Sequence, residues 1–253
     1  MPDDLHRDHP RMEGPAAGAQ GAAPMGGHSP ECGAEHGLRA RAGCGGDDSR
    51  DTRPDRATRF VETTLGVLSY KELAPLLGER VTRLEAAVQA EEFARRALDE
   101  SLLTEFHARV CGDLTPAWAG KWRDVTVAVG PLTPPAPHQL QMLMRDYALD
   151  LQARWDRASA DDIDLTLELL AFAEGRFLSI HPFRDFNGRT IRVFLMELLR
   201  RLDLPLVDLA PDTEDGRARY FAALEAADRR DWQPLVTIWK SRFGSEPDAD
   251  MAT

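Results

Sequence analysis

The sequence has few cysteines, no long uninterrupted apolar run and no apolar leader at its start. Its 253 residues include three cysteines, an odd number that indicates no disulfide framework. No run of about eighteen apolar residues marks a membrane-spanning helix. The opening residues, MPDDLHRDHPRMEG, lack the apolar core of a secretion signal. These absences predict a soluble, cytoplasmic protein.

Basic residues are fewer than acidic ones. The chain holds 31 Lys and Arg against 42 Asp and Glu, which gives a net charge of −11 and a pI near 5.1. Such a charge repels the phosphates of nucleic acids and the headgroups of anionic membranes. We therefore expect neither nucleic acid nor membrane as a partner. A local basic pocket can still bind a phosphate-bearing ligand.

Large aliphatic residues are scarce in the first part of the chain. Residues 1–55 are rich in Gly, Pro, Ala, Asp and Arg, so they cannot bury enough apolar surface to offset the entropy lost on ordering. We predict a disordered tail there and a disordered C-terminus at 246–253. Four tail residues match zinc ligands by type, but their loose spacing favours scattered side chains over a metal site: His28, Cys32, His36 and Cys44.

From about residue 56 the composition becomes that of a globular domain, mostly with the spacing of helices. We predict a short helix at 56–66 and a domain over 67–245, with helices broken near Pro75 and Gly78. In the last third, apolar residues recur at helical spacing on both sides of a polar stretch at 179–192. The domain is therefore predicted to be an all-α helical bundle.

One segment has the alternation of a strand instead. Val125, Val127 and Val129 alternate with Thr126 and Ala128, and Gly130-Pro131 then breaks the run. This pattern predicts a small β-hairpin near residues 123–133, the one β element that we expect in the domain.

The polar stretch between the two apolar helices is SIHPFRDFNGRTIR. Asn187 is suited to cap the second helix, and Gly188 lets the backbone approach a ligand closely. The free N–H groups at a helix start bind anions, and Arg189 and Arg192 lie on the same side of that helix, as phosphate binding requires. Asp185 is a candidate Mg²⁺ ligand, and His181 can accept a proton from a hydroxyl near neutral pH. Together these residues predict a site that holds a nucleotide triphosphate and activates a hydroxyl.

The sequence HPFRDFNGRTIR resembles the motif of the Fic (Fic/Doc) family, whose usual form is HPFx(D/E)GNGRxxR. The resemblance extends over about residues 56–243, because AGKWRDVTVAVG looks like the segment leading into the family's flap hairpin. RYFAALEAADRRDWQPLVTIW likewise looks like its closing helices. Fic proteins are all-α apart from that hairpin, so the resemblance implies the same fold as the periodicity.

The resemblance also implies an activity, since most Fic enzymes transfer AMP from ATP to a Ser, Thr or Tyr hydroxyl of a target protein. It assigns His181 as general base and Asp185 as ligand of Mg²⁺, with Phe183 anchoring the loop. Four residues would bind the nucleotide: Asn187 and Gly188 in the anion hole, Arg189 at a phosphate and Arg192 at the γ-phosphate. The flap would pair with the target through Val125, Thr126, Val127, Ala128 and Val129.

The motif departs from the family pattern at one position and distinguishes between branches at another. Phe186 stands where the usual pattern has Gly, and a side chain directed inward there would crowd the phosphates. Gly188 favours AMP transfer, because the Doc-type phosphotransferases carry Lys at that place. Two alternatives stay open: a related transferase that uses another nucleotide or phosphate donor, and a non-catalytic binding module whose anion hole is blocked by Phe186.

Many Fic proteins are inhibited by a helix carrying (S/T)xxxE(G/N). The nearest match here is TRFVET, with Thr58 and Glu62 at the two defining positions and Thr63 where Gly or Asn is usual. It lies just before the domain, as an intramolecular inhibitor would. If Glu62 is only a surface residue, the restraint comes from a separate antitoxin-like protein or is absent. A toxin–antitoxin-like arrangement is therefore one of the expectations.

Overall fold

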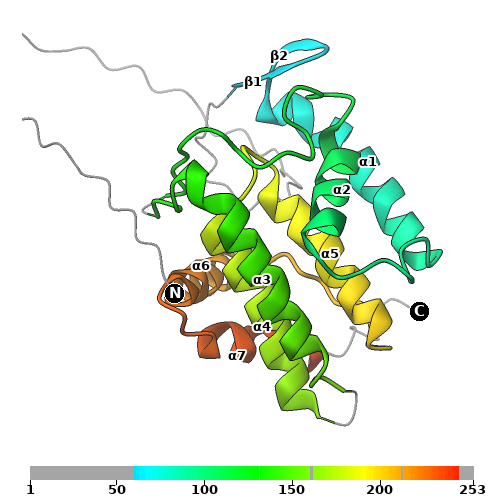
Figure 1. Ribbon diagram of the computed structural model, residues 1–253, viewed down its shortest axis with the longest axis vertical. Helices are drawn as coiled ribbons and strands as arrows, with labels where there is room; N and C mark the ends of the chain where they lie inside the picture. The colour runs from blue at the N-terminus through cyan, green and yellow to red at the C-terminus, as the bar shows by residue number, and fades with distance from the viewer. Residues whose placement is uncertain (1–59, 131, 160–161, 212, 245–253) are drawn as a thin grey trace, which may run out of the picture. The chain divides into compact units, whose positions relative to one another are not determined.

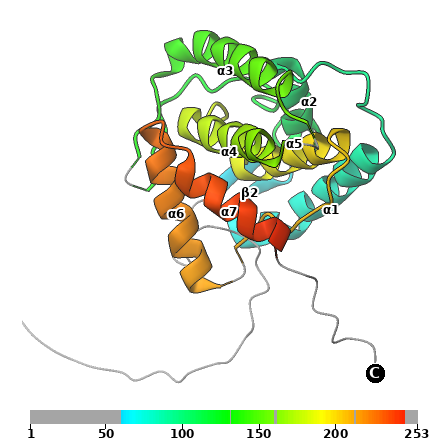
Figure 2. The same cartoon turned by 90° about the horizontal axis from the view of Figure 1, so that it is seen from below.

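The computed structural model describes residues 60–244 except 131, 160, 161 and 212. The predicted tail at 1–55 with its Cys and His residues, Thr58 and the C-terminus at 246–253 lie outside the described residues. The all-α prediction is confirmed (Figures 1 and 2). The helices are α1 (Tyr70–Gln89), α2 (Glu100–Cys111), α3 (Leu140–Trp155), α4 (Ile163–Ile180), α5 (Asn187–Arg201), α6 (Glu214–Asp228) and α7 (Gln233–Gly244), with a short 3-10 turn, η1, at Pro137–Gln139.

Helix α4 lies at the centre of the bundle. It contacts α3, α5, α6 and α7, while α1 and α2 pack against α5 (Figures 1 and 2). Only four of the 18 residues of α4 are charged, and twelve of the 18 are buried, including Leu170, Phe177 and Ile180. A helix that is apolar all round must be covered on every side, which explains its central place.

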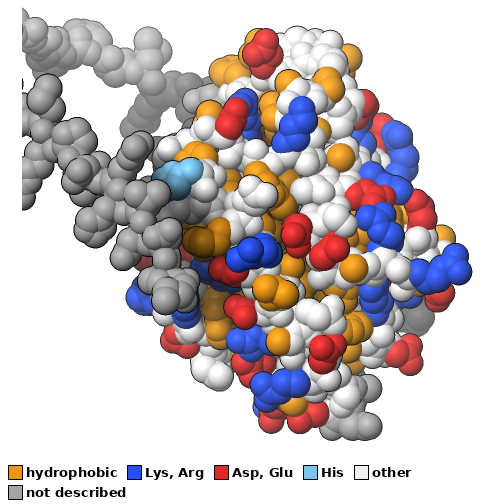
Figure 3. Space-filling model, viewed as in Figure 1, with side chains coloured by type: hydrophobic (Ala, Val, Ile, Leu, Met, Phe, Trp, Pro, Cys, Tyr) orange, Lys and Arg blue, Asp and Glu red, His pale blue; other side chains and the backbone are white. Residues whose placement is uncertain are grey.

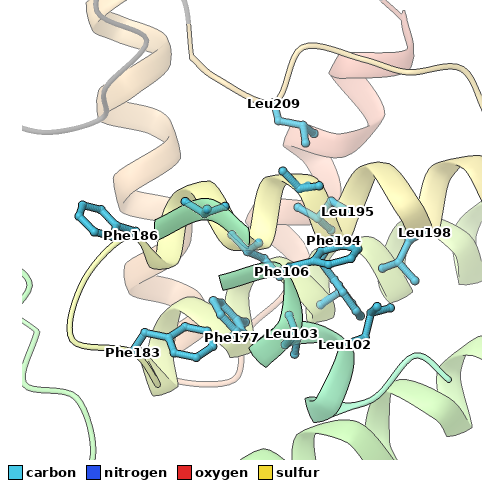
Figure 4. Packing of buried hydrophobic residues seen from close by; sticks show 14 of the residues in the cluster. Leu102, Leu103, Phe106, Phe177, Phe183, Phe186, Phe194, Leu195, Leu198 and Leu209 are labelled. Carbon is cyan, nitrogen blue, oxygen red and sulfur yellow. The ribbon is translucent and has the colours of Figure 1, made fainter. Parts of the chain in front are cut away.

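The core continues from α4 into α5 through a cluster of aromatic and leucine side chains (Figure 4). Phe194 of α5 contacts Phe106 of α2 edge-to-face, with ring centroids 6.3 Å apart. The ring centroid of Phe177 in α4 lies 6.1 Å from that of Phe183, in the link between α4 and α5. The polar stretch of the sequence is thus held between the two most deeply packed helices.

The helix predicted at 56–66 is wrong for its described part. Residues 60–69 form an antiparallel hairpin of β1 (Phe60–Thr63) and β2 (Gly66–Ser69), in which Val61 pairs with Leu68. Gly66 has a φ of 105°, which an L-residue rarely adopts, and the Thr64 N–H donates to the Leu114 carbonyl at 2.9 Å. β-Branched residues and this contact with the segment after α2 favour strand over helix.

The hairpin predicted near 123–133 is also wrong. Among the described residues of that segment there is a single bridge, between Val129 and Leu132. The valines alternate as in a strand, but Val125 and Val129 are exposed and Val127 is only half-buried. Alternation alone therefore does not produce a paired strand here, because a strand also needs a neighbour that bonds its backbone.

Helix α1 runs through Pro75 and Gly78, where the sequence predicted breaks. A proline inside a helix costs about 3 kcal/mol. Here Leu73, Leu77 and Leu84 are buried on one face of the helix. The Ser69 N–H also donates to the Glu72 carboxylate at 2.8 Å, closing a capping box. Burial and capping together outweigh the one missing hydrogen bond.

The surface is mixed in charge. On the face seen in Figure 3, acidic and basic side chains of the described residues lie interspersed with apolar ones. Within the described part of the chain, no helix has both the length and the apolar character needed to cross a bilayer.

The thiol of Cys111 lies at the end of α2 in the core, and burial raises its pKa to about 12. Only the thiolate reacts with alkylating reagents, so we expect Cys111 to resist iodoacetamide at pH 8. Because the folded pKa is raised above the ordinary value of 9.0, the thiol stabilises the fold below pH 9, and this stability is lost as the pH rises from about 9 toward 12. Mass spectrometry of a Cys32→Ser, Cys44→Ser variant isolates Cys111, with the urea-unfolded chain as positive control. Rapid labelling of the native chain would contradict the burial.

Candidate functional site

The motif occupies the link between α4 and α5. His181 ends α4, its N–H donating to the Phe177 carbonyl at 2.9 Å, and its backbone has φ 50° and ψ 61°. This left-handed conformation is uncommon for residues other than glycine, although histidine adopts it more readily than most. It turns the chain sharply at His181, so that the next residues reach the start of α5 rather than extending α4.

The side chain of Asn187 fixes the shape of this link. Its Oδ1 accepts from the Phe183 N–H and its Nδ2 donates to the Phe183 carbonyl, both at 2.9 Å. The sequence predicted Asn187 as the residue that caps α5. Instead Phe186 precedes the helix and Asn187 is its first residue, with a buried amide that binds the loop backbone. Both hydrogen-bonding ends of the amide are used to close the loop, and its backbone N–H remains part of the helix start.

Phe183 anchors the loop in the core, as the family resemblance implied. Its ring is fully buried and stacks on His107 of α2, with centroids 3.8 Å apart and planes 7° apart. In Figure 4 Phe183 points toward Phe177. The loop is therefore packed on one side and its backbone polar groups are bonded on the other.

His107 is a residue of the site that the sequence did not reveal. The Gly120 N–H donates to its Nδ1 at 2.8 Å, so the proton of the neutral ring is on Nε2, which donates to the Asp185 carbonyl at 3.2 Å. Burial lowers its pKa to about 4. His107 thus joins α2 to the motif. The only signal in the sequence was a histidine among the apolar residues of a helix, which is common in cores.

Phe186 has the backbone that glycine would favour, with φ 57° and ψ 16°. Its ring is buried, however, 5.7 Å from the ring of Trp118 and 6.4 Å from that of Tyr70. The side chain therefore lies in the core between α1 and the segment after α2. A ring directed at the phosphates would have blocked the start of α5, and this geometry removes that objection to an anion site.

The start of α5 is open. Apart from its own helix, a Cβ built on Gly188 would meet no atom of the described residues within 4 Å, so a ligand can approach the backbone there. Arg189 and Arg192 follow in the first turns, both half-buried. Arg192 is near enough to Tyr220 of α6 to lower the pKa of its hydroxyl, while burial raises that pKa by more. The helix start thus combines free space with two cations.

Asp185 is buried beside this helix start. Its Oδ1 accepts from the Phe186 N–H at 2.8 Å. Among the described residues no group of three or more His, Cys, Asp and Glu is arranged to hold a metal ion. A cation here would take Asp185 as a single protein carboxylate, with phosphate and water oxygens completing its shell, which is the coordination Mg²⁺ accepts.

A groove of about 820 Å³ extends from Asp185 across the surface. Its walls are β1, residues 114–118 and residues 125–128. It brings together three sets of predicted residues: Asp185, Glu62 and four of the flap residues, Val125, Thr126, Val127 and Ala128. The fifth, Val129, lies beyond them in the bridge to Leu132.

Glu62 was predicted as an inhibitory residue carried by a helix. In the structure Glu62 lies on strand β1, where it is exposed and faces the groove.

Glu174 of α4 has a structural role, to which the sequence gave no clue. Its buried carboxylate accepts from the Tyr220 hydroxyl at 2.7 Å and from Arg242 at 3.0 Å, which ties α4 to α6 and α7.

Comparisons with known proteins find relatives of similar sequence. Protein adenylyltransferase fic-1 of Caenorhabditis elegans is 33% identical over 156 residues, which are 60% of this chain and 28% of the relative. Protein adenylyltransferase Fic of Culex quinquefasciatus is 33% identical over 134 residues, which are 53% of this chain and 25% of the relative. The chain thus spans little more than a quarter of the length of these curated relatives.

Two solved structures share the fold. The BepC effector protein of Bartonella tribocorum, solved with bound AMPPNP, superposes with a TM-score of 0.57 at 18% identity and covers 74% of this chain and 93% of its own. The N-terminal FIC domain of Bep8 from Bartonella sp. 1-1C gives 0.59 at 19% identity, over 81% and 98%. The Fic/DOC family model matches residues 97–199, which contain α2, α3, α4, the motif and most of α5. Residues 97–199 therefore match the Fic/DOC family.

Proposed function

We propose that the chain is a protein adenylyltransferase that moves AMP from ATP to a Ser, Thr or Tyr hydroxyl of a target protein. The observation that carries the proposal is the open start of α5, where Gly188, Arg189 and Arg192 follow the short link that holds His181 and Asp185. The adenylyltransferase names of the relatives that are 33% identical support the same reaction.

The residues divide the chemistry among them. The N–H groups of α5, with Arg189 and Arg192, bind the phosphates. The target oxygen bonds to the α-phosphorus, the bond from that phosphorus to the oxygen bridging to the β-phosphate breaks, and pyrophosphate leaves. The hydroxyl proton goes to the imidazole of His181. Preorganised donors and positioning supply most of the rate.

A Mg²⁺ ion fits Asp185, whose carboxylate is held by the Phe186 N–H at the groove. When bound, such an ion neutralises phosphate charge and orients the leaving group. Asp185 would hold it, and the phosphates would complete its coordination.

The target segment is proposed to lie along residues 125–129, of which 125–128 form one wall of the groove that reaches Asp185. Exposed backbone in this segment can pair with an extended peptide, so part of the recognition is independent of side chains. Val125 offers an exposed apolar contact on this wall, and Val129, also exposed, lies just beyond it.

Transfer of label from ATP tests the reaction. With α-labelled ATP and Mg²⁺, label should enter protein in a lysate, and with γ-labelled ATP it should not. EDTA should abolish transfer, and an excess of UTP or GTP should compete poorly. Label from the γ-position would show phosphoryl transfer instead. No label from either, with a folded chain that binds Mg·ATP, would favour another donor or a binding module.

We further propose that Glu62 restrains this activity, although from a strand and not from the predicted helix. Its carboxylate lines the same groove as Asp185, and a like charge near bound phosphates is unfavourable. Glu62→Gln removes the charge and keeps the size, so transfer at low ATP should rise about fivefold, as roughly 1 kcal/mol between charges a few ångströms apart implies.

Glu79→Gln on the exposed face of α1 is the matched control, and it should not change transfer. If Glu62→Gln transfers AMP at the same rate as the native chain, Glu62 does not restrain the activity. The restraint would then come from a separate inhibitor protein or be absent.

A further inference from the structure

The side chain of Arg123 joins the motif to the flap segment, residues 125–135. It is only 2% exposed. Its Nε donates to the His181 carbonyl at 2.8 Å, Nη1 to the Val125 carbonyl at 3.0 Å and Nη2 to the Pro135 carbonyl at 2.6 Å. A longer contact of 3.4 Å reaches the Ile180 carbonyl. Its own N–H donates to the Pro182 carbonyl at 2.8 Å.

These bonds are unusual in that a buried cation is satisfied by main-chain carbonyls. Burial lowers the pKa of the Arg123 guanidinium. A buried charge is tolerated when its donors are paired, and the planar guanidinium presents five N–H groups at fixed angles. A lysine ammonium is a point charge on a flexible stem and cannot span the same set of carbonyls. The pattern therefore requires arginine in particular.

The bonded carbonyls belong to two segments with different roles. His181 and Ile180 form the end of α4, where the chain turns through the left-handed conformation that presents the imidazole. Val125 and Pro135 are the two ends of the flap segment, which in Figure 1 runs between α2 and α3 past the start of α5. One rigid group thus fixes the base and the proposed target-docking wall to each other.

We propose that Arg123 is a positioning residue for AMP transfer, which holds the flap segment in register with His181 so that a hydroxyl bound along the flap meets the imidazole. The inference rests on the proposed function. Beyond that function, we infer that target docking and the placement of the base both depend on the Arg123 guanidinium. Nucleotide binding at the start of α5 does not depend on it.

The test compares Arg123→Lys with Arg201→Lys. Arg201 is a matched control because it is also largely buried and donates to two main-chain carbonyls, those of Arg96 at 2.9 Å and Phe93 at 2.7 Å, away from the motif. Both variants keep the charge and lose the geometry of the guanidinium. A general loss of stability should therefore affect both alike, as thermal unfolding will measure.

Arg123→Lys should reduce kcat roughly 10- to 100-fold, as misplacement of reacting groups by about 1 Å does. Its Kd for Mg·ATP, from calorimetry, should stay within about threefold of the native value. Arg201→Lys should keep both values near those of the native chain. A native kcat in Arg123→Lys, or an equal fall of kcat in the two variants, would overturn the proposal.

Hydrogen exchange provides a readout that does not depend on catalysis. In Arg123→Lys the amides of both 125–135 and 181–187 should exchange faster, whereas Arg201→Lys should affect those of 93–96. Faster exchange in only one of the two segments, or in neither, would show that Arg123 does not couple them. If the native chain transfers no AMP, the proposed reaction fails, and the exchange data still decide whether Arg123 joins the two segments.

Discussion

Replacing His181 with alanine is expected to lower AMP transfer about 100-fold to 10,000-fold, the usual contribution of a general base. The imidazole belongs to the residue that ends α4, in the link that leads to the start of α5, and the carboxylate of Asp185 in the same link is assigned to Mg²⁺. The phosphate-binding groups lie on α5 and are unchanged, so ATP binding should survive. The measurement is the initial rate of transfer from α-labelled ATP, together with the Kd for Mg·ATP.

His138→Ala is the matched control for this experiment. His138 is exposed in η1 and lies outside the motif, so its loss should leave the rate unchanged. Thermal unfolding should show both variants folded. A His181→Ala protein that kept more than about a tenth of the native rate would remove His181 from the role of base. Equal losses of rate and ATP binding would instead assign it to the phosphate site.

Phe186→Ala is expected to destabilise the fold by about 3–5 kcal/mol, the usual cost of removing a buried phenylalanine ring. Phe186→Gly should cost about 1 kcal/mol less than Phe186→Ala, because the left-handed backbone at φ 57° is strained for alanine and free for glycine. The order is informative because glycine is ordinarily the more destabilising of the two. The free energy of unfolding in urea measures both values.

The variants Phe194→Ala and Phe194→Gly within α5 are the control, because they remove a buried ring from a position with ordinary helical backbone. Phe194 is fully buried in regular helix, where glycine should be worse than alanine by roughly 0.8–1 kcal/mol. The same order at both positions would contradict the strain at Phe186. Retention of Mg·ATP binding in Phe186→Gly would show that the phenylalanine serves packing and not the phosphate site.

The helices around the motif were predictable because their apolar residues repeat with the period of a helix over long stretches. The motif was predictable because its polar residues are adjacent in the chain, so local spacing brings His181, Asp185 and Gly188 near one another. Two predictions failed for different reasons. The helix predicted at 56–66 rested on a short pattern that fits helix or strand, and its described part is strand. The hairpin predicted near 123–133 rested on alternation alone, and the described residues of that segment pair only through the bridge from Val129 to Leu132.

Other parts of the site could not be found by spacing. His107 and Arg123 act on the motif through backbone carbonyls of Asp185 and His181, at separations of 78 and 58 residues. A carbonyl is present at every position of a chain, so it leaves no signature in the side chains of its partner. The burial of Phe186 likewise depends on Trp118 and Tyr70, which only the packing of α1 and α2 against α5 brings to it.

The sequence by itself determined the helical class of the domain, the place of the motif between two apolar helices and the family of the domain, because each is written in local periodicity or in adjacent residues. Only the tertiary structure decided where the strands are, which way Phe186 points and which groups hold the loop. Those features depend on contacts between segments distant in the chain, and their free energies are set by burial and hydrogen bonding that no local pattern contains.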